Sequence, residues 1–371
     1  MKIAQVAPLF ESVPPKLYGG TERVVSWLTE ELVRQGHEVT LFASGDSNTG
    51  ARLVPVCERS LRLDDQCKDE LAHIVLGLEK VIQMEQEFDL VHWHVDYIAY
   101  PLERRMTTPH VTTLHGRLDI PDLVPIYREY KDIPLISISN SQRKPLPWAN
   151  WQATVYHGLP IDHFDFQSQP GKYLAFLGRI SPEKGADHAI EIAERVGMPL
   201  KIAAKISKAD QPYYEEVIKP LIDSHPNVEF LGEISEKEKN LFLGNAFALL
   251  FPINWPEPFG IVMIESMACG TPIIAFPGGS VTEVMENGES GFVVPNVDGA
   301  VKALDRVARL NRKTVRHVFE NRFTSRQMTE NYLKAYKRII ENAPTPLPLD
   351  YRRVSNGKDR HLQFPTGLFT D

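Results

Sequence analysis

The sequence is short of cysteine and has no strong excess of one charge. Cysteine occurs three times in 371 residues, and Cys57, Cys67 and Cys269 form neither a disulfide framework nor a zinc-binding spacing. The formal net charge is −7, whereas a nucleic-acid-binding protein would present a basic face. We therefore expect a protein of the reducing cytoplasm that has no nucleic-acid partner.

Long apolar runs are missing as well. No stretch reaches the length of a transmembrane helix, and Met1 leads directly into a strand-like segment at residues 2–7, without the features of a signal peptide. We expect no transmembrane segment, which leaves a peripheral membrane contact open. The remaining composition, with 43% hydrophobic and 24% charged residues, is that of a soluble globular protein, and the length suits two domains.

Two signatures of ligand binding are also absent. The fingerprint G-x-G-x-x-G does not occur, which disfavours a classical NAD-binding domain. Four histidines, His92, His94, His110 and His115, raise the question of a metal, and His92 and His94 would share one face of a strand. Their neighbours are those of ordinary sheet, and no third ligand stands at a telling spacing, so we expect no metal site.

The chain does contain a regular alternation of strand-like and helix-like segments. Strands are expected at residues 2–7, 38–43, 89–94, 110–116, 135–139, 153–156, 173–177, 199–204, 228–231, 246–251, 272–276 and 291–294. Helices are expected at 21–33, 71–87, 186–196 and 325–342, while 44–70 is polar and shows no clear pattern. This alternation predicts α/β domains with doubly wound parallel sheets, and residues 167–171 resemble a linker between two of them.

Several polar groups follow expected strands, where ligands bind in such sheets. Gly19-Gly20 is either a plain turn or a turn whose backbone N–H groups approach a phosphate, with Gly20 or Thr21 capping the next helix. Asp96 and His115 also fall at strand ends.

In the second half of the chain, two cations follow an expected strand. Arg179 and Lys184 flank a tight turn there. A fixed pair of positive charges at such a place can bind a diphosphate.

The stretch from Pro256 to Glu265 organises the second half of the chain. It follows a buried strand as a proline-rich loop and leads into a short helix that opens near Gly260 and stops at Gly270. Glu257 lies at the helix mouth, where unsatisfied N–H groups suit an anion. Glu265 stands among apolar residues inside the helix, where an unpaired carboxylate would be costly.

These motifs resemble one family. Glu-Pro-Phe-Gly followed by the second glutamate resembles the E-x7-E signature of retaining GT-B glycosyltransferases, family 4 (group 1) in the sequence-based classification. The string Gly-Arg-Ile-Ser-Pro-Glu-Lys-Gly at 178–185 is similar to the family's, in the same order and spacing. His157-Gly158 stands at the interdomain segment, with His in place of the usual Asn and Leu-Pro-Ile in place of Val. The resemblance covers nearly the whole chain.

The resemblance implies a GT-B fold, with two Rossmann-like lobes around a cleft. The acceptor-side lobe would span residues 1–168 and the nucleotide-sugar lobe 169–324. A helix and tail at 325–371 would pack back on the first lobe.

The implied reaction transfers a hexosyl group from a nucleoside diphosphate sugar to an acceptor hydroxyl with retention, UDP-glucose being the first expectation for the donor. No further cofactor is implied. The chain lacks the Asp-x-Asp pair of metal-dependent glycosyltransferases of the other main fold, so we expect transfer without a divalent metal. The alternatives are another GT-B activity, such as a sugar-nucleotide epimerase or phosphorylase, and a non-catalytic nucleotide-sugar sensor.

The resemblance also assigns residues. The implied catalytic residues are His115, Arg179, Lys184 and Glu257. The implied donor-binding residues are Gly19, Gly20, Arg179, Lys184, Glu257, Phe259, Gly260 and Glu265. Among them, Glu265 would bind the ribose hydroxyls, and Glu257 would lie beside the transferred sugar. Asp96 and Arg117 are candidates for acceptor binding, and Gly278-Gly279-Ser280 is either a capped turn or a further sugar or phosphate contact.

Overall fold

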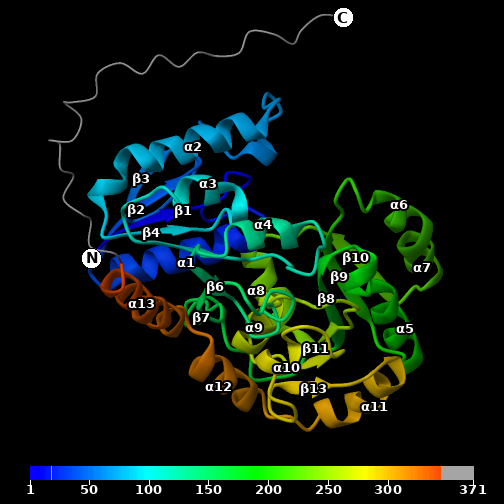
Figure 1. Cartoon of the computed structure of the whole chain (residues 1–371). Helices are drawn as coiled ribbons and strands as arrows, with labels where there is room; N and C mark the ends of the chain where they lie inside the picture. The colour runs from blue at the N-terminus through cyan, green and yellow to red at the C-terminus, as the bar shows by residue number, and fades with distance from the viewer. Residues whose placement is uncertain (18, 344–371) are drawn as a thin grey trace, which may run out of the picture.

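The computed structural model describes residues 1–17 and 19–343, which form two α/β lobes (Figure 1). The sheet of the first lobe has seven strands in the order β3-β2-β1-β4-β5-β6-β7. These strands are β1 (Lys2–Val6), β2 (Glu38–Ala43), β3 (Arg52–Pro55), β4 (Leu90–Trp93), β5 (His110–Thr113), β6 (Leu135–Ser137) and β7 (Trp151–Thr154). The helices of this lobe are α1 (Gly20–Arg34), α2 (Glu70–Met84), α3 (Tyr100–Glu103) and α4 (Leu123–Glu129).

The sheet of the second lobe has six strands in the order β10-β9-β8-β11-β12-β13. They are β8 (Tyr173–Arg179), β9 (Leu200–Lys205), β10 (Val228–Gly232), β11 (Ala246–Phe251), β12 (Ile273–Ala275) and β13 (Gly291–Val293). The helices are α5 (Ala186–Val196), α6 (Gln211–Tyr213), α7 (Lys219–Ser224), α8 (Glu236–Gly244), α9 (Ile261–Ala268), α10 (Val281–Val284), α11 (Val297–Val307), α12 (Arg312–Arg322) and α13 (Ser325–Glu341).

All pairings between these strands are parallel. The expected pair of doubly wound parallel sheets is therefore confirmed. The expected strands and helices agree with the observed ones to within a few residues at either end.

The structure resolves one stretch that the pattern left open and corrects one expected detail. The polar stretch 44–70 holds β3, an edge strand, which explains why it lacks the apolar run of a central strand. Neither Gly20 nor Thr21 caps α1, because the N-cap is Gly19 and no side chain caps it. Gly19 has φ 158°, and a Cβ there would come within 2.7 Å of Pro15 Cβ, so the turn requires glycine.

The long C-terminal helix α13 lies against the first lobe, alongside α1 (Figure 1). Its Tyr332 and Tyr336 are fully buried. The Tyr332 hydroxyl lies 3.2 Å from Thr113 Oγ1, and the Tyr336 hydroxyl lies 2.6 Å from His92 Nδ1. His92 is thus a hydrogen-bonded core histidine. Residues 344–371, for which packing on the same lobe was predicted, lie outside the described part of the chain.

Each sheet has one point where the strand order reverses. In the first lobe β1 lies between β2 and β4, and in the second β8 lies between β9 and β11. In the first sheet the chain passes from β1 to β2 on one side and from β4 to β5 on the other, and β8 and β11 are followed in the same way by β9 and β12. Connections that leave neighbouring strands in opposite directions open a crevice beyond their carboxyl ends. The chain reaches Ala7 and His94 at the first of these switch points, and Arg179 and Pro252 at the second.

Candidate functional site

A cleft of about 510 Å³ is lined by residues of both lobes. It brings together most of the residues that the sequence singled out. They are Gly19, Gly20 and His115 from the first lobe, and Arg179, Lys184, Glu257, Phe259, Gly260 and Glu265 from the second.

The basic side of the cleft follows β8. Gly185 has φ 71°, and a Cβ there would lie 2.1 Å from the carbonyl oxygen of Pro252. Glycine therefore lets this turn lie directly against the end of β11. The Lys184 ammonium, in the same turn, donates to the Glu257 carboxylate. Arg179 bonds Glu183 and lies 3.3 Å from Asp210 through Nε. Both cations are thus held in place by carboxylates beside the cleft.

Glu257 is held from three directions. Lys184 bonds its carboxylate, and Trp255 Nε1 donates to the same oxygen at 3.0 Å. The backbone oxygen of Glu257 accepts from Ser280 N at 2.9 Å, and a Cβ on Gly279 would lie 2.1 Å from that oxygen. The turn at 278–280 therefore supports the Glu257 loop, with Gly279 at φ 56°. Trp255 is a site residue that the motifs did not indicate.

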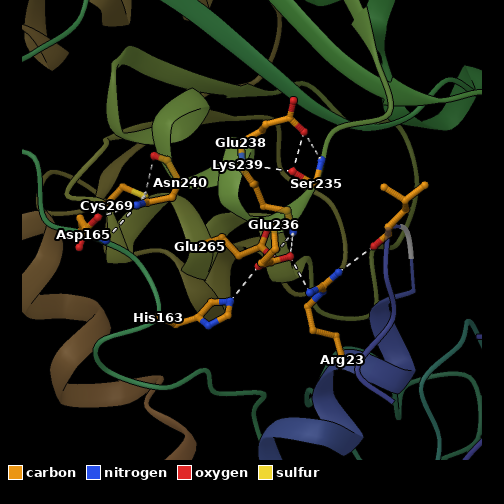
Figure 2. Close-up of polar contacts among 11 residues, drawn as sticks. Arg23, His163, Asp165, Ser235, Glu236, Glu238, Lys239, Asn240, Glu265 and Cys269 are labelled. Atoms are coloured by element: carbon orange, nitrogen blue, oxygen red, sulfur yellow. Dashed lines mark hydrogen bonds and ion pairs between the residues drawn. The ribbon is translucent and has the colours of Figure 1, made fainter. Parts of the chain in front are cut away.

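Glu265 belongs to a chain of ion pairs that crosses between the lobes (Figure 2). Lys239 Nζ lies 2.7 Å from Glu265 Oε1 and 3.3 Å from Glu236 Oε2. Arg23 Nη1 from α1 lies 2.5 Å from Glu236, and His163 Nε2 lies 2.9 Å from the other oxygen of that carboxylate. Lys239 therefore compensates the charge of the buried Glu265 carboxylate, and Glu236 links Lys239 to Arg23 of the first lobe.

The protonation state of Glu236 reflects this setting. Burial works against its charge, but His163, Lys239 and Arg23 outweigh burial and lower the pKa of Glu236 to about 2. Arg23, Glu236 and Lys239 could not be singled out from the sequence, because they resemble ordinary helix charges and only the approach of α1 to α8 brings them together.

His115 ends a relay of buried side chains. Gln5 Oε1 lies 2.8 Å from His94 Nε2, and His94 Nδ1 lies 2.9 Å from His115 Nε2. Because Gln5 presents an oxygen to His94, Nε2 of His94 carries the proton and donates to it. Nδ1 of His94 then accepts from Nε2 of His115. The remaining ring nitrogen of His115, Nδ1, is therefore an acceptor. This atom has no hydrogen-bond partner among the described residues. Burial lowers the pKa of His115 to about 3, so the ring is neutral and can accept from a hydroxyl.

The two candidates for acceptor binding lie apart. Asp96 lines a second cavity of about 330 Å³ that also includes His115. Arg117 is not among the residues that line either cavity. Its guanidinium bonds both oxygens of Asp119 at 2.7 Å and lies 5.7 Å from the Trp255 ring centroid. Asp96 therefore lines a cavity that adjoins the cleft, whereas Arg117 lies outside the lining of both, next to Trp255.

The described residues hold neither a cluster of potential metal ligands nor a helix suited to a membrane. No group of three or more His, Cys, Asp and Glu side chains is arranged to hold a metal ion in this part of the chain. Within residues 1–17 and 19–343, none of the helices combines the length and the apolar character needed to span a bilayer.

Two family descriptions match the chain. "Glycosyl transferases group 1" matches residues 161–343, and "Glycosyltransferase Family 4" matches residues 18–156. The D-inositol 3-phosphate glycosyltransferase of Mycolicibacterium smegmatis is 24% identical, with 87% of each chain covered. The phosphatidyl-myo-inositol mannosyltransferase of the same organism is 25% identical, with 82% of this chain and 84% of the relative covered.

Solved structures share the two-lobe fold. AviGT4, a glycosyltransferase involved in avilamycin A biosynthesis, has a TM-score of 0.71 at 22% identity, covering 92% of this chain and 98% of its own. HepE of Anabaena in complex with UDP has a TM-score of 0.68 at 18% identity, covering 91% of this chain and 100% of its own.

Proposed function

Because the chain belongs to the group 1 glycosyltransferases with the GT-B fold, we propose that it transfers a hexosyl group from a nucleoside diphosphate sugar to an acceptor hydroxyl, with retention of configuration. The observation that carries the proposal is the convergence of Arg179, Lys184, Glu257 and Glu265 in one cleft. That cleft offers fixed positive charge for a diphosphate and two carboxylates for hydroxyl groups.

The diphosphate lies between the lobes in this proposal. Arg179 and Lys184 approach it from the second lobe, and the backbone N–H groups of the Gly19-Gly20 turn approach from the first. Arg can bind phosphate through two parallel hydrogen bonds, and Lys acts as a point charge. These groups are fixed before the reaction, so they stabilise the charge that develops on the leaving diphosphate.

The sugar and the ribose are bound by carboxylates. Glu265 accepts hydrogen bonds from the ribose diol, with Lys239 holding the carboxylate at 2.7 Å. Glu257 accepts from hydroxyls of the transferred hexose, beside the backbone N–H groups around Phe259 and Gly260. His115 lines the cleft and contacts the hexose near its hydroxymethyl arm. We propose UDP-glucose as the donor, supported by the UDP and UDP-glucose complexes of the structural neighbour HepE.

Bond changes take place on one face of the sugar. The bond from the anomeric carbon to the diphosphate oxygen breaks with its electron pair on that oxygen, and the acceptor oxygen forms the new bond. The acceptor proton passes to the leaving diphosphate. Glu257 is already bonded to Lys184 and Trp255, which supports a binding role rather than attack on the sugar.

The cations take the place of a metal in this account. Turnover should survive EDTA, because Arg179 and Lys184 compensate the charge on the diphosphate. Loss of turnover with EDTA and recovery with magnesium or manganese would contradict it.

A thermal-shift screen of UDP-, GDP- and ADP-sugars tests the donor assignment. A ligand at 100 times its dissociation constant stabilises by about 2.7 kcal/mol. The UDP-sugar should give the largest shift, and incubation with an acceptor should yield a glycoside of the same anomeric configuration. An epimerised nucleotide sugar, or transfer to inorganic phosphate, would indicate an epimerase or a phosphorylase. Binding without any transfer or donor hydrolysis would indicate a sensor.

A further inference from the structure

The cavity of about 330 Å³ lies at the switch point of the first lobe. Val6 and Ala7 line it from the end of β1, and His94 and Val95 from the end of β4. It shares Thr21, Glu22 and His115 with the donor cleft, so the two cavities adjoin. Ligands in open α/β sheets bind in this type of crevice, and its volume is in the range of small-molecule pockets.

The walls of this cavity are mainly apolar. They include Val6, Phe42, Val56, Ile74, Leu78 and Ile98. The polar side chains of the lining are a minority: Thr21, Glu22 and His115, which also line the donor cleft, and His94 and Asp96, which follow β4. No lysine or arginine is among the described residues that line it. The lining therefore fits an uncharged, apolar group.

One polar side chain stands out in this wall. Asp96 has φ 52°, a left-handed conformation that is uncommon for a residue other than glycine. Such strain tends to be kept at functional sites. Burial raises the pKa of the Asp96 carboxyl to about 6, while an interaction with the backbone of His115 acts in the opposite direction. A carboxyl group in this setting can hydrogen-bond a hydroxyl without a neighbouring cation.

We propose that this cavity is the acceptor subsite, and that it takes an acceptor whose reactive hydroxyl is carried on an apolar body, an alkyl chain or an aromatic ring. The proposal rests on the proposed function, since it names the acceptor of that reaction. The apolar body fills the space between β1, β4 and α2. The hydroxyl lies at the shared edge, near Asp96 and His115, where it faces the anomeric carbon of a donor in the adjoining cleft.

Binding of 1-alkanols, from butanol to octanol, tests the proposal on the wild-type protein. Ligand-observed NMR can measure their dissociation constants with UDP absent and with UDP at saturation. Burial of each added methylene should lower the dissociation constant roughly fourfold until the cavity is full. Affinity that does not change with chain length would overturn the proposal.

Substitutions locate the binding. Ile98 is 37% exposed at the cavity, so Ile98→Asp places a charge there without burying it in the core. Val217 in the second lobe is 39% exposed, and Val217→Asp is the matched control. Octanol affinity should fall at least tenfold in Ile98→Asp and stay unchanged in Val217→Asp, while UDP binding persists in both. Ile98→Trp narrows the cavity without adding charge and should also weaken octanol binding. Equal octanol affinity in all four proteins would overturn the assignment.

The outcomes separate this proposal from the one it rests on. UDP binding together with a flat alkanol series overturns the apolar acceptor subsite alone. The expected alkanol series without UDP binding overturns the donor assignment, and the acceptor role of the cavity falls with it. Formation of an octyl glycoside from a UDP-sugar supports both.

Discussion

The two lobes have the same kind of switch point but opposite chemistry there. In the second lobe, Arg179, Lys184 and Glu257 stand beyond the ends of β8 and β11. In the first, apolar side chains such as Val6 and Ile98 line the crevice beyond β1 and β4. The shared topology provides a crevice in each lobe, and the loops that follow the strands decide what each crevice binds.

The carboxylates show the same contrast. Glu257 and Glu265 each have a lysine partner, so their burial is compensated. In the first lobe, burial raises the pKa of Glu22 to about 7 and that of Asp96 to about 6. Burial favours the neutral form of both carboxyls, although Arg23 and Lys205 act in the opposite direction on Glu22. Lysines thus compensate the buried carboxylates of the second lobe, whereas burial favours the neutral form of those near the crevice of the first.

The largest effect is expected at the switch point of the second lobe, where the charged side chains lie. Lys184→Ala removes one preorganised charge, and turnover should fall by roughly 10²–10³-fold. The matched control is Lys201→Ala, because Lys201 is also in the second lobe but pairs with Glu229 at 2.9 Å, outside the lining of the cleft. Steady-state kinetics with saturating donor measure the difference. Equal losses in the two variants would remove the chemical contrast between the lobes.

Glu265→Ala should have the next largest effect. Losing hydrogen bonds from the ribose to a charged group costs on the order of 1.5–3 kcal/mol, a roughly 10–150-fold loss of affinity. Calorimetric titration with UDP measures it, and octanol affinity serves as the control from the other lobe. Unchanged UDP affinity would show that Glu265 only neutralises Lys239.

A smaller effect is expected where the lobes are linked. Arg23→Ala removes the contact of α1 with Glu236. The lobes should separate more readily, which small-angle scattering would show as a larger radius of gyration. UDP affinity should fall only severalfold, because Lys239 still holds Glu265. A scattering profile identical to that of the wild type would mean that this ion pair does not hold the cleft closed.

A further contrast concerns how the stability of each lobe depends on pH. Burial raises the pKa of Glu103 to about 8, although Thr112 Oγ1 donates to its carboxyl at 2.9 Å. Between pH 4.5 and about 8 the folded state holds one more proton at Glu103 than the unfolded state. Stability contributed by this group is therefore present at low pH and is lost as the pH rises toward 8, by up to about 1.4 kcal/mol per unit.

Glu103→Gln removes this dependence. The variant should gain stability relative to the wild type as the pH rises from 5 to 8, which urea unfolding at several pH values measures. Glu236→Gln acts in the second lobe with the opposite sign, because the lowered pKa of Glu236 gives stability that is lost only as the pH falls below about 4.5. Parallel pH profiles of the two variants would contradict the contrast.

Much of the fold followed from the sequence because it depends on local patterns. Apolar runs such as 246–251 predict buried strands, and their alternation with helices predicts parallel sheets. The edge strand β3 was missed because an edge strand needs no continuous apolar run. Lys184, Glu257 and Glu265, which line one cleft in the structure, could be singled out because they stand beside a glycine turn and a helix mouth that are visible in the chain.

Sequence by itself determined the two sheets, the turns at Gly19 and Gly185, and the residues of the motifs, because each depends on neighbours within a few positions. Only the tertiary structure decided which side chains pair with one another. Arg23 reaches Glu236 only through the packing of two lobes, and His115 gains its orientation from His94, which follows another strand. The apolar cavity also has no local signature, because its walls come from β1, β2, α2 and the segment after β4. Side chains far apart in the sequence come into contact only when the lobes fold and pack together, and burial then shifts their pKa values.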